Sequence, residues 1–588
     1  MNIALISPPW PLFNRPSIQI GALKAFLDEN LQGSKTYCFH PYLKIAEAVG
    51  FDTYHLISQS SWASESVFSS LLFPENKKAK ELFYRSLKQR FKAKNNNLNF
   101  KEISKACKTV ADEYIKSFNF SSFELIGISI CLNQFTSGLY FAKKIKSLWP
   151  HVKIVLGGAS VSGEIGPSVK EVFPFVDFII NGEGEAPLLK LCLDIKEGKA
   201  PEITNEEKRQ IKDLNTLPPP NYDHYFKELF SIKGASGIQV VLPIEASRGC
   251  WWGKCTFCNL NLQWNGYRAK SDNKIAQEVD FLCKRYDQID FAFMDNCLPK
   301  KGAAKIFKAL YSHKRDYCFF AEIRASHSLN ELKEMKRAGL KDLQVGIEAL
   351  STSLLNRLQK GATTIKNLAV MRHCKELGIN LQSNLITEFP GTTYEEIEET
   401  LKNLEFAWPL FILKPVSFWL GLESPVYVNS KDFNIKTVRP HRYYNHLFPK
   451  DYNKRLIPLI FEYSGDKTLQ KDLWRPVYKK LKDMEAQQKS LNHKEPFLSY
   501  RDAGHFLMIR QVLPNGQILK HKLTNISRKI YLDCMEPKRL DYIFNLAPHI
   551  PKQKIEAFIN NLHSKHIIFR EKDEVLSLAI RAPFHEDI

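Results

Sequence analysis

The sequence predicts an α/β protein with three folded units: a doubly wound domain, a partial (β/α)6 barrel and a small winged-helix-like domain. Three observations support this prediction. Residues 1 to about 200 alternate continuous apolar runs with amphipathic segments, which indicates a parallel sheet covered on both faces. Six further strand and helix pairs follow, and then a compact pattern of two strands and three helices. A chain of 588 residues is long enough for several hydrophobic cores.

The first domain is expected over residues 1–215. Its strands are predicted at 2–7, 124–131, 152–158 and 177–181. A ligand of such a domain lies beyond the carboxyl ends of the strands. The densest basic run, residues 77–94, has apolar residues at helical spacing. We interpret it as the outer face of an amphipathic helix rather than a nucleic-acid site.

The barrel is expected over residues 235–430, after a polar and proline-rich linker at 200–235. Barrel chemistry belongs at the carboxyl ends of the strands. The six barrel strands are predicted at 238–246, 289–295, 318–324, 342–348, 379–388 and about 411–420.

The last two regions differ in pattern. Residues 431–503 are basic, aromatic and poorly periodic, so we expect an irregular connection. Residues 504–588 contain two strand-like runs around the turn Leu513-Pro514-Asn515-Gly516, three helical segments and a hairpin-like end. This order predicts a winged-helix-like domain.

Composition narrows the class of protein. Apolar residues make up 44% of the chain and charged residues 25%, which is typical of a globular protein. The formal net charge of +20 permits an acidic partner, although a solvated basic surface is the simpler explanation. Twelve scattered cysteines, no recognisable leader and no uninterrupted apolar stretch favour a reducing cytoplasm.

The chemistry is expected in the segment SRGCWWGKCTFC, directly after the first barrel strand. Its thiols, Cys250, Cys255 and Cys258, can ligate three irons of a [4Fe–4S] cluster and leave the fourth iron open. Phe257 would shield the cluster from water. The alternatives are buried free cysteines or a structural zinc site, which needs a fourth ligand such as Cys297.

This loop resembles that of the radical S-adenosylmethionine (SAM) superfamily. The spacing here is C-x4-C-x2-C, one residue longer than the usual C-x3-C-x2-C. The flanking residues resemble the subgroup that matures ribosomally made peptides and carries a Rossmann-like, cobalamin-binding type N-terminal domain. The similarity covers nearly the whole chain, in the segments 15–19 (RPSIQ), 182–185 (GEGE), 267–271 (YRAKS) and 389–392 (FPGT).

The resemblance implies a [4Fe–4S] cluster, SAM, and reductive SAM cleavage that leads to attack on an unactivated carbon. An electron donor such as flavodoxin or ferredoxin would reduce the cluster. Polar residues at strand ends would bind SAM, although each could equally belong to a structural ion pair. These candidates are Asp295, Glu322, Arg324 and Glu348.

The resemblance also implies cobalamin in the first domain. The candidate contacts lie after predicted strands and in the GEGE segment, although a glycine pair can also be a tight turn. They are Ser129, Asn133, Gly157, Gly158, Gly182 and Glu183. The D-x-H-x-x-G motif of histidine-ligating cobalamin proteins is absent, because Ser7-Pro8-Pro9-Trp10 follows the first strand. Any cobalamin should therefore lack that histidine ligand; alternatively, the domain is vestigial and empty.

The C-terminal unit is weakly similar to the peptide-recognition domain of peptide-modifying enzymes. A strand edge beside a helix can take an extended leader peptide, and basic residues would suit an acidic one. These are Lys520, Lys522, Arg528 and Lys529. A DNA-binding winged helix and a structural cap are the alternatives. We expect deletion of 504–588 to weaken peptide binding without stopping SAM cleavage.

The predicted function is radical SAM modification of a precursor peptide, by cobalamin-dependent methyl transfer to carbon. The alternatives are dehydrogenation or crosslinking without cobalamin and, from another class, an iron–sulfur nucleic-acid-binding regulator. The predicted partners are the precursor peptide and the electron donor, with no nucleic acid and no membrane.

Overall fold

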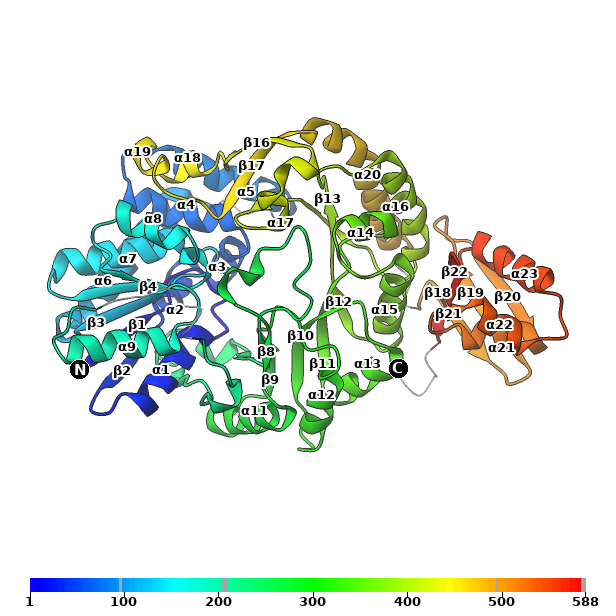
Figure 1. The fold of residues 1–588 in the computed structure, drawn as a ribbon, viewed down its shortest axis with the longest axis horizontal. Helices are drawn as coiled ribbons and strands as arrows, with labels where there is room; N and C mark the ends of the chain where they lie inside the picture. The colour runs from blue at the N-terminus through cyan, green and yellow to red at the C-terminus, as the bar shows by residue number, and fades with distance from the viewer. Residues whose placement is uncertain (95–97, 202–209, 493–494, 583–588) are drawn as a thin grey trace.

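The structure is a computed structural model that describes residues 1–94, 98–201, 210–492 and 495–582. Figure 1 shows the N-terminal domain in blue and cyan, the barrel in green and the C-terminal domain in orange and red, arranged in a row. A yellow segment lies across the top of the first two units. Residues 202–209 of the expected linker lie outside the described residues.

The N-terminal domain contains a five-stranded parallel sheet of order β2-β1-β3-β4-β5. Strand order reverses between β1 and β3, so the doubly wound prediction is confirmed for this sheet. The sequence reading missed β2. The strands are β1 (Asn2–Ile6), β2 (Lys35–Phe39), β3 (Leu125–Ser129), β4 (Lys153–Gly157) and β5 (Phe178–Ile179).

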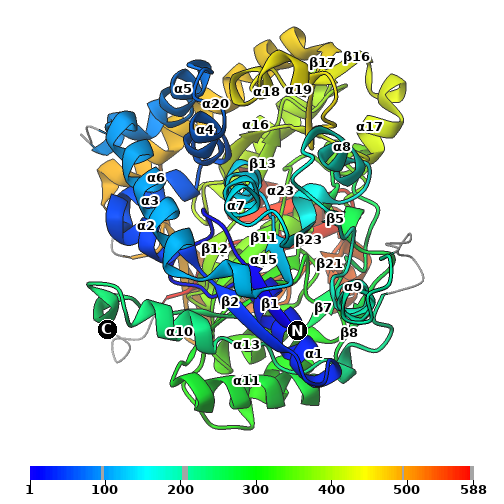
Figure 2. The ribbon, with the colours of Figure 1, turned by 90° about the vertical axis from the view of Figure 1, so that its left-hand side faces the viewer.

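Helices cover both faces of this sheet (Figure 2). Apolar side chains of α1 (Ile18–Asn30) and α9 (Glu185–Lys196) form a small core with one face. The other face packs into a larger core together with most remaining helices. These are α2 (Pro41–Val49), α3 (Phe51–Ser58), α4 (Ser61–Leu72), α5 (Lys78–Lys94), α6 (Phe100–Ser117), α7 (Phe135–Leu148) and α8 (Ile165–Val172). The basic run is indeed a helix, α5, whose Ala79, Leu82, Phe83 and Leu87 are buried.

The barrel is open and parallel. Its main sheet has the order β12-β11-β10-β9-β6, and an isolated bridge from Glu348 to Leu385 leads to the pair β13-β14. Each of the six predicted positions contains a strand, and the fifth is split in two. The strands are β6 (Leu242–Ile244), β9 (Asp290–Phe293), β10 (Cys318–Arg324), β11 (Leu340–Gly346), β12 (Asn380–Gln382), β13 (Asn384–Thr387) and β14 (Lys414–Ser417).

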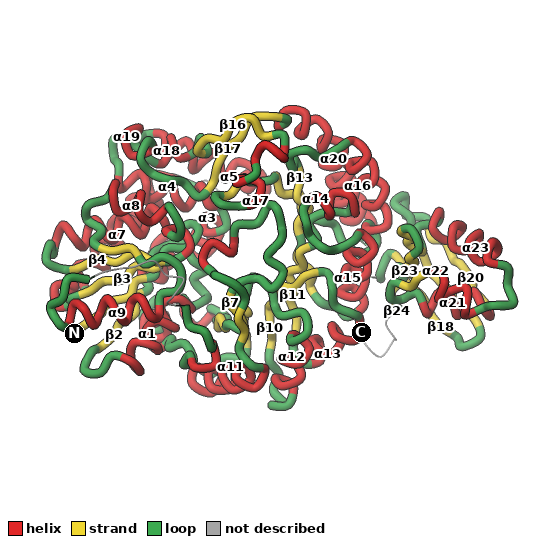
Figure 3. Tube along the Cα trace, viewed as in Figure 1, coloured by secondary structure: helices red, strands yellow, loops and turns green. Residues whose placement is uncertain are grey.

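Helices follow the barrel strands on the outside, and Figure 3 shows them in red around the yellow strands. They are α11 (Asp272–Tyr286), α12 (Ala303–Tyr311), α13 (Leu329–Arg337), α14 (Thr352–Arg357), α15 (Thr364–Glu376) and α16 (Tyr394–Ala407). Helix α10 (Asp223–Leu229) precedes the barrel. A short antiparallel ribbon of β7 (Ser247–Arg248) and β8 (Arg268–Ala269) holds both ends of the cysteine loop.

The region 431–503, which we expected to be irregular, contains regular structure. An antiparallel sheet of order β15-β17-β16 leads into the 25-residue helix α20. Helix α18 packs on α4 and α5, so this region bridges the first domain and the barrel. Two short elements, β15 (Leu420–Gly421) and α17 (Pro425–Val428), precede this region. Its own elements before the C-terminal domain are β16 (Ile435–Pro440), α18 (Tyr444–Leu447), α19 (Lys450–Asn453), β17 (Ile460–Gly465) and α20 (Lys467–Leu491).

The C-terminal domain has the predicted strands and three helices, with additional short strands. Its sheets have the orders β20-β19-β18-β24 and β21-β23-β22. The elements are β18 (Leu498–Asp502), β19 (Phe506–Val512), β20 (Ile518–Thr524), α21 (Asn525–Asp533), β21 (Lys538–Arg539), α22 (Leu540–Leu546), α23 (Lys552–Ser564), β22 (Ile568–Glu571), β23 (Glu574–Ser577) and β24 (Ile580–Arg581).

This domain is docked on barrel helix α15. The Arg372 side chain is fully buried, and it donates to the carbonyl oxygens of Ala579 (3.2 Å) and Met535 (3.4 Å). Glu571 accepts a hydrogen bond from the backbone N–H of Ile365 (2.9 Å). The C-terminal domain therefore forms part of the surroundings of α15. Among the described helices, none has the length and apolar character needed to cross a membrane.

Candidate functional site

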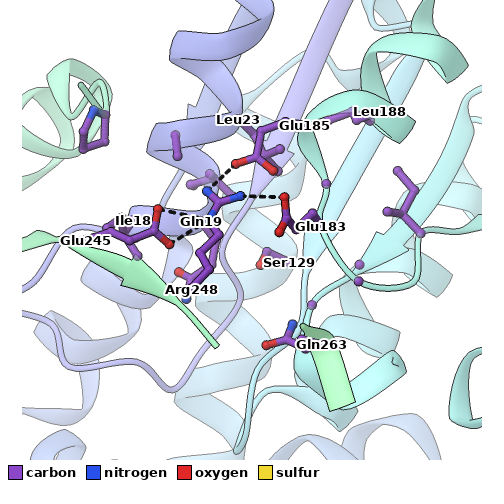
Figure 4. A pocket seen from close by; sticks show the side chains of 18 of the residues that line it. Ile18, Gln19, Leu23, Ser129, Glu183, Glu185, Leu188, Glu245, Arg248 and Gln263 are labelled. Atoms are coloured by element: carbon purple, nitrogen blue, oxygen red, sulfur yellow. Dashed lines mark hydrogen bonds and ion pairs between the residues drawn. The ribbon is translucent and has the colours of Figure 1, made fainter. Parts of the chain in front are cut away.

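A cavity of about 250 Å³ lies at the carboxyl edge of the N-terminal sheet. Its walls come from the strand ends, from α1 and α9, and from the barrel segment that carries Arg248 and Trp264 (Figure 4). Five of the six predicted cobalamin contacts line it: Ser129, Gly157, Gly158, Gly182 and Glu183. The sixth, Asn133, is not among its lining residues; its side-chain amide donates to the Ser58 carbonyl (2.8 Å).

The glycine pair also has a structural reason. Gly158 has φ of 101°, and a Cβ there would lie 2.6 Å from the Ile130 carbonyl oxygen. Glycine is therefore required where the chain leaves β4 and passes close to the end of β3. The tight-turn interpretation explains Gly158, and the same turn forms part of the cavity wall.

Glu183 is part of a buried ion network. Its carboxylate pairs with Arg248 (3.1 Å) and with Arg268. Arg248 also pairs with Glu185 (2.6 Å) and Glu245 (2.9 Å), and Figure 4 shows its guanidinium group surrounded by the three carboxylates. Although burial disfavours its ionisation, the Arg248 charge holds the pKa of Glu185 below its usual value.

The cysteine loop follows β7. Cys250, Cys255 and Cys258 are half-buried free thiols, and the Cys258 N–H donates to the Cys255 carbonyl (3.2 Å). Burial raises the pKa of Cys258 to about 11, and the neighbouring thiols Cys255 and Cys250 add to this rise.

Two tryptophans attach the loop to the rest of the barrel. The indole N–H of Trp251 donates to the Leu298 carbonyl (3.1 Å), and that of Trp252 donates to the Gln359 carbonyl (2.8 Å). The Arg324 guanidinium lies 4.4 Å from the Trp252 ring centroid and 3.8 Å from the Cys255 sulfur. Arg324 therefore contacts both Trp252 and the second cysteine of the loop.

The donor set fits an iron–sulfur cubane better than a single metal ion. Across the described residues, no three His, Cys, Asp or Glu side chains converge in a group that could hold one ion. A cubane does not require convergence, because each thiolate binds a different iron. Cys297, the possible fourth zinc ligand, is buried; burial and the neighbouring Cys250 raise its pKa to about 12.

The four predicted strand-end residues lie in different environments. Asp295 is buried and accepts hydrogen bonds from the Ala246 N–H (3.0 Å) and the Ser247 hydroxyl (2.6 Å), so it anchors the start of the cysteine loop. Glu348 has φ of 62° and pairs with Lys360 (3.0 Å). Both carboxylates therefore already have hydrogen-bond or ion-pair partners within the protein.

Glu322 is the best placed of the four to meet a ligand. Within the described chain, no hydrogen bond or ion pair involves its carboxylate. Burial raises its pKa to about 7, and the negative charges of Asp295 and Glu348 contribute to the rise. A positively charged group would relieve this repulsion.

The sequence reading missed the roles of several charged residues near these sites. Lys360 is buried, and its ammonium lies 5.8 Å from the ring centroid of Phe257, inside the cysteine motif. Arg248 and Glu185 stand inside the motifs SRGC and GEGE, which carried the resemblance. The sequence therefore contained the charged residues of the buried ion pair, but no pattern in it indicated that the two motifs contact each other.

Comparison with protein families assigns the barrel. The family model described as the Radical SAM superfamily matches residues 244–404, which include the end of β6, the cysteine loop and the strands from β9 to β13.

Residues 244–404 are a radical SAM domain.

A radical SAM domain carries a [4Fe–4S] cluster and binds SAM, so the predicted cluster and SAM are confirmed as cofactors of this chain. The individual ligands stay predictions. Cys250, Cys255 and Cys258 are the three predicted cluster thiols, and Glu322 lies near the carboxyl end of β10, at the end of the barrel where active sites are usually found.

Solved structures share the fold over most of the chain. The cobalamin-dependent SAM radical enzyme OxsB, with aqua-cobalamin and SAM bound, has a TM-score of 0.54 at 15% identity, covering 96% of this chain and 75% of that one. The radical SAM methyltransferase TsrM from Kitasatospora setae, with cobalamin and a [4Fe–4S] cluster, has a TM-score of 0.53 at 14% identity, covering 82% and 90%.

Curated relatives match part of their own length. An uncharacterised methyltransferase of Pyrococcus horikoshii is 26% identical over 47% of this chain and 63% of its own length. An anaerobic magnesium-protoporphyrin IX monomethyl ester cyclase of Rubrivivax gelatinosus is 24% identical over 45% and 52%. The matches thus span between half and two thirds of these two relatives. They favour neither the cobalamin-independent alternative nor the nucleic-acid-binding regulator.

Proposed function

We propose that this chain is a cobalamin-dependent radical SAM methyltransferase that acts on an unactivated carbon of a ribosomally made peptide. One observation carries the cobalamin part: the cavity at the edge of the N-terminal sheet is closed by the radical SAM domain itself, through Arg248 and Trp264. A group in that cavity would therefore lie beside the loop that precedes the cluster cysteines.

The cavity suits the nucleotide end of a cobalamin. Its inner part is apolar and belongs to the small core of the sheet, through Leu5, Ile20 and Leu188. Its outer part contains backbone and polar groups, as ligand sites of doubly wound domains do. None of the described residues that line it is a histidine.

The cofactors supply the radical and the methyl group, and the protein supplies orientation and exclusion of water. Trp251, Trp252 and Phe257 flank the cysteines with aromatic surface. Arg324 and Lys360 place positive charge near Cys255, where it would offset the negative charge of a bound cluster. Asp295 holds the backbone at Ala246 and thereby orients the start of the loop.

The test uses anaerobically reconstituted enzyme. It should bind about four irons and take up hydroxocobalamin, whose cobalt(II) form should lack axial nitrogen splitting in electron paramagnetic resonance, because no histidine lies in the loops 7–10 or 129–134. With methyl-labelled SAM and candidate precursor peptides encoded near the gene, mass spectrometry should show a labelled methyl group on carbon. SAM cleavage by a C250A/C255A/C258A variant, or axial nitrogen splitting, would contradict the proposal.

The peptide substrate is supported by the C-terminal domain. Strand β20 is the edge of its sheet, and Lys520 and Lys522 are exposed on it. Arg528, a further predicted contact, is instead paired with Asp502 (2.6 Å), and Lys529 is exposed on α21. An extended acidic leader could add to the β20 edge.

Charge reversal tests this assignment. K520E/K522E should weaken binding of an acidic leader peptide about tenfold or more in fluorescence anisotropy, because two attractive contacts become repulsive. K529E on α21 is the matched control and should have a smaller effect. Equal weakening by both variants would point to general electrostatics and against strand addition.

We also propose a cytoplasmic location and a flavodoxin or ferredoxin as electron donor.

A further inference from the structure

The guanidinium group of Arg248 connects two parts of the chain that the function requires to be held together. Arg248 belongs to β7, two residues before Cys250. Glu183 and Glu185 belong to the N-terminal domain, at the start of α9. The ion pairs Arg248–Glu183 (3.1 Å) and Arg248–Glu185 (2.6 Å) therefore cross from the radical SAM domain to the cofactor cavity.

The three side chains that form the cross-domain ion pairs are buried. The side chains of Arg248, Glu183 and Glu185 are 5%, 2% and 6% exposed. Buried charges of this kind are costly unless they are paired and hydrogen-bonded. Here all three nitrogens of the guanidinium donate to carboxylates: Nε to Glu245, Nη1 to Glu183 and Nη2 to Glu185. The three directions are fixed by one rigid planar group.

A second arginine reinforces the same connection. Arg268 stands opposite Arg248 in the β7–β8 ribbon. It pairs with the other oxygen of Glu183 and donates to the Ile211 carbonyl (2.6 Å). The ribbon that holds both ends of the cysteine loop is thus attached at two points to the wall of the cavity.

We propose that Arg248 is a positioning residue, which fixes the cysteine loop relative to the cofactor in the N-terminal cavity. This inference rests on the proposed function for its consequence, since it concerns the relative position of cluster and cobalamin. The ion pairs that support it are contacts between side chains of this protein and do not depend on any cofactor. It gives the GEGE and SRGC segments one shared role.

Hydrogen exchange tests the connection without any cofactor. E185Q removes one cross-domain charge and should raise exchange of amides in both 182–188 and 247–258 about tenfold, the effect of losing a charge-assisted hydrogen bond. R248K keeps the charge but loses the planar fork, and should raise exchange on the other side, in 182–188. E245Q is the matched control. Glu245 accepts from the same guanidinium but belongs to the radical SAM domain, so the increase in exchange should be confined to 247–258.

The distance between the cobalt and the iron–sulfur cluster tests whether Arg248 positions the cysteine loop. In enzyme loaded with cobalt(II) cobalamin and reduced cluster, pulsed electron paramagnetic resonance should give a broader distance distribution for E185Q and R248K than for wild type. E245Q should give the wild-type distribution, an outcome that a general loss of stability would not produce.

Two results would overturn the proposal: unchanged exchange in 182–188 for R248K, or indistinguishable E185Q and E245Q in both segments and in the distance measurement. If wild-type protein takes up no cobalamin, the proposed function fails separately, and the exchange experiment still decides whether Arg248 connects the two domains.

Discussion

Gly249 stands immediately before Cys250, the first predicted cluster ligand, in the left-handed region at φ of 81°. A Cβ at this position would lie 2.3 Å from the carbonyl oxygen of Gly266. A side chain would therefore push apart the two ends of the cysteine loop.

G249A should lower the iron content of reconstituted protein several-fold. The left-handed conformation alone costs a non-glycine residue about 1–2 kcal/mol, and the contact adds to this cost. G266A is the matched control, because Gly266 also has positive φ (77°) but a Cβ there would meet nothing within 4 Å. Iron and sulfide assays compare the two; equal iron loss would mean that strain, not contact, controls the loop.

Asp295 makes stability depend on pH. Burial raises its pKa to about 7, against the hydrogen bonds from Ser247 and Ala246. The folded state therefore binds this proton more tightly than the unfolded chain does. The resulting stability, on the order of 4 kcal/mol, is fully present below about pH 4 and is lost as pH rises through about 7.

D295N should flatten the dependence of melting temperature on pH between about 4 and 7 in cluster-free protein, because asparagine does not titrate. Asp280 is the control: its pKa is lowered, chiefly by a hydrogen bond from Lys284, so it titrates below this window. D280N should keep the wild-type slope. A D295N slope equal to wild type would contradict a raised pKa at this site.

At the residue scale, the sequence predicted the three cysteines of the loop, and five of its six predicted cobalamin contacts line the cavity. These residues stand in motifs or at strand ends, and strand ends follow from apolar patterning. Arg248, Glu185 and Lys360 were not assigned, because their partners are distant in sequence: residue 248 meets residue 185 across 63 positions. No local pattern reports such a pairing.

At the scale of elements, the strongly apolar strands were predicted and the others were missed. Strand β10 has the predicted bounds 318–324. Strand β2 (KTYCF) begins with an exposed lysine and lies at the sheet edge, so its pattern is weak. Helix α20 contains Pro476, which usually breaks helices, and its mean hydropathy is low.

Helix α15 bears on the expectation that the C-terminal domain can be deleted without stopping SAM cleavage. Ten of its residues, including Arg372 and His373, are buried, because the barrel covers one side and the C-terminal domain another. Burial lowers the pKa of His373 to about 3, so this imidazole is neutral in the folded protein. The deletion of 504–588 that we expected to spare SAM cleavage would expose this surface.

Deleting 504–588 should therefore lower the melting temperature by roughly 10 °C or cause aggregation, since several buried groups lose their partners. Scanning fluorimetry and gel filtration measure this outcome, with the K520E/K522E variant as a control that leaves the docking surface intact. A truncated protein with wild-type melting temperature and full SAM cleavage would show that the domain is separable after all.

On the scale of the whole molecule, one large core of buried residues extends from the N-terminal sheet through the barrel to the C-terminal domain. A second, smaller core lies between α1, α9 and the N-terminal sheet, and it borders the cavity. The site proposed for cobalamin is thus surrounded by the smaller of the two cores.

Hydroxocobalamin should raise the melting temperature of the cluster-free chain. A ligand at one hundred times its dissociation constant stabilises the folded state by about 2.7 kcal/mol. Differential scanning calorimetry measures the shift, with SAM alone as the comparison. The absence of any shift at saturating hydroxocobalamin would favour a vestigial, empty domain.

The surroundings of α15 have a consequence for evolution and for engineering. A helix whose two sides face different domains is constrained by both, so neither neighbour can be exchanged alone. Chimeras that graft the C-terminal domain of a relative onto this barrel should fold only when α15 is transplanted with it. In such swaps the natural crossover point lies before Thr364, inside the barrel, rather than at the boundary between the domains.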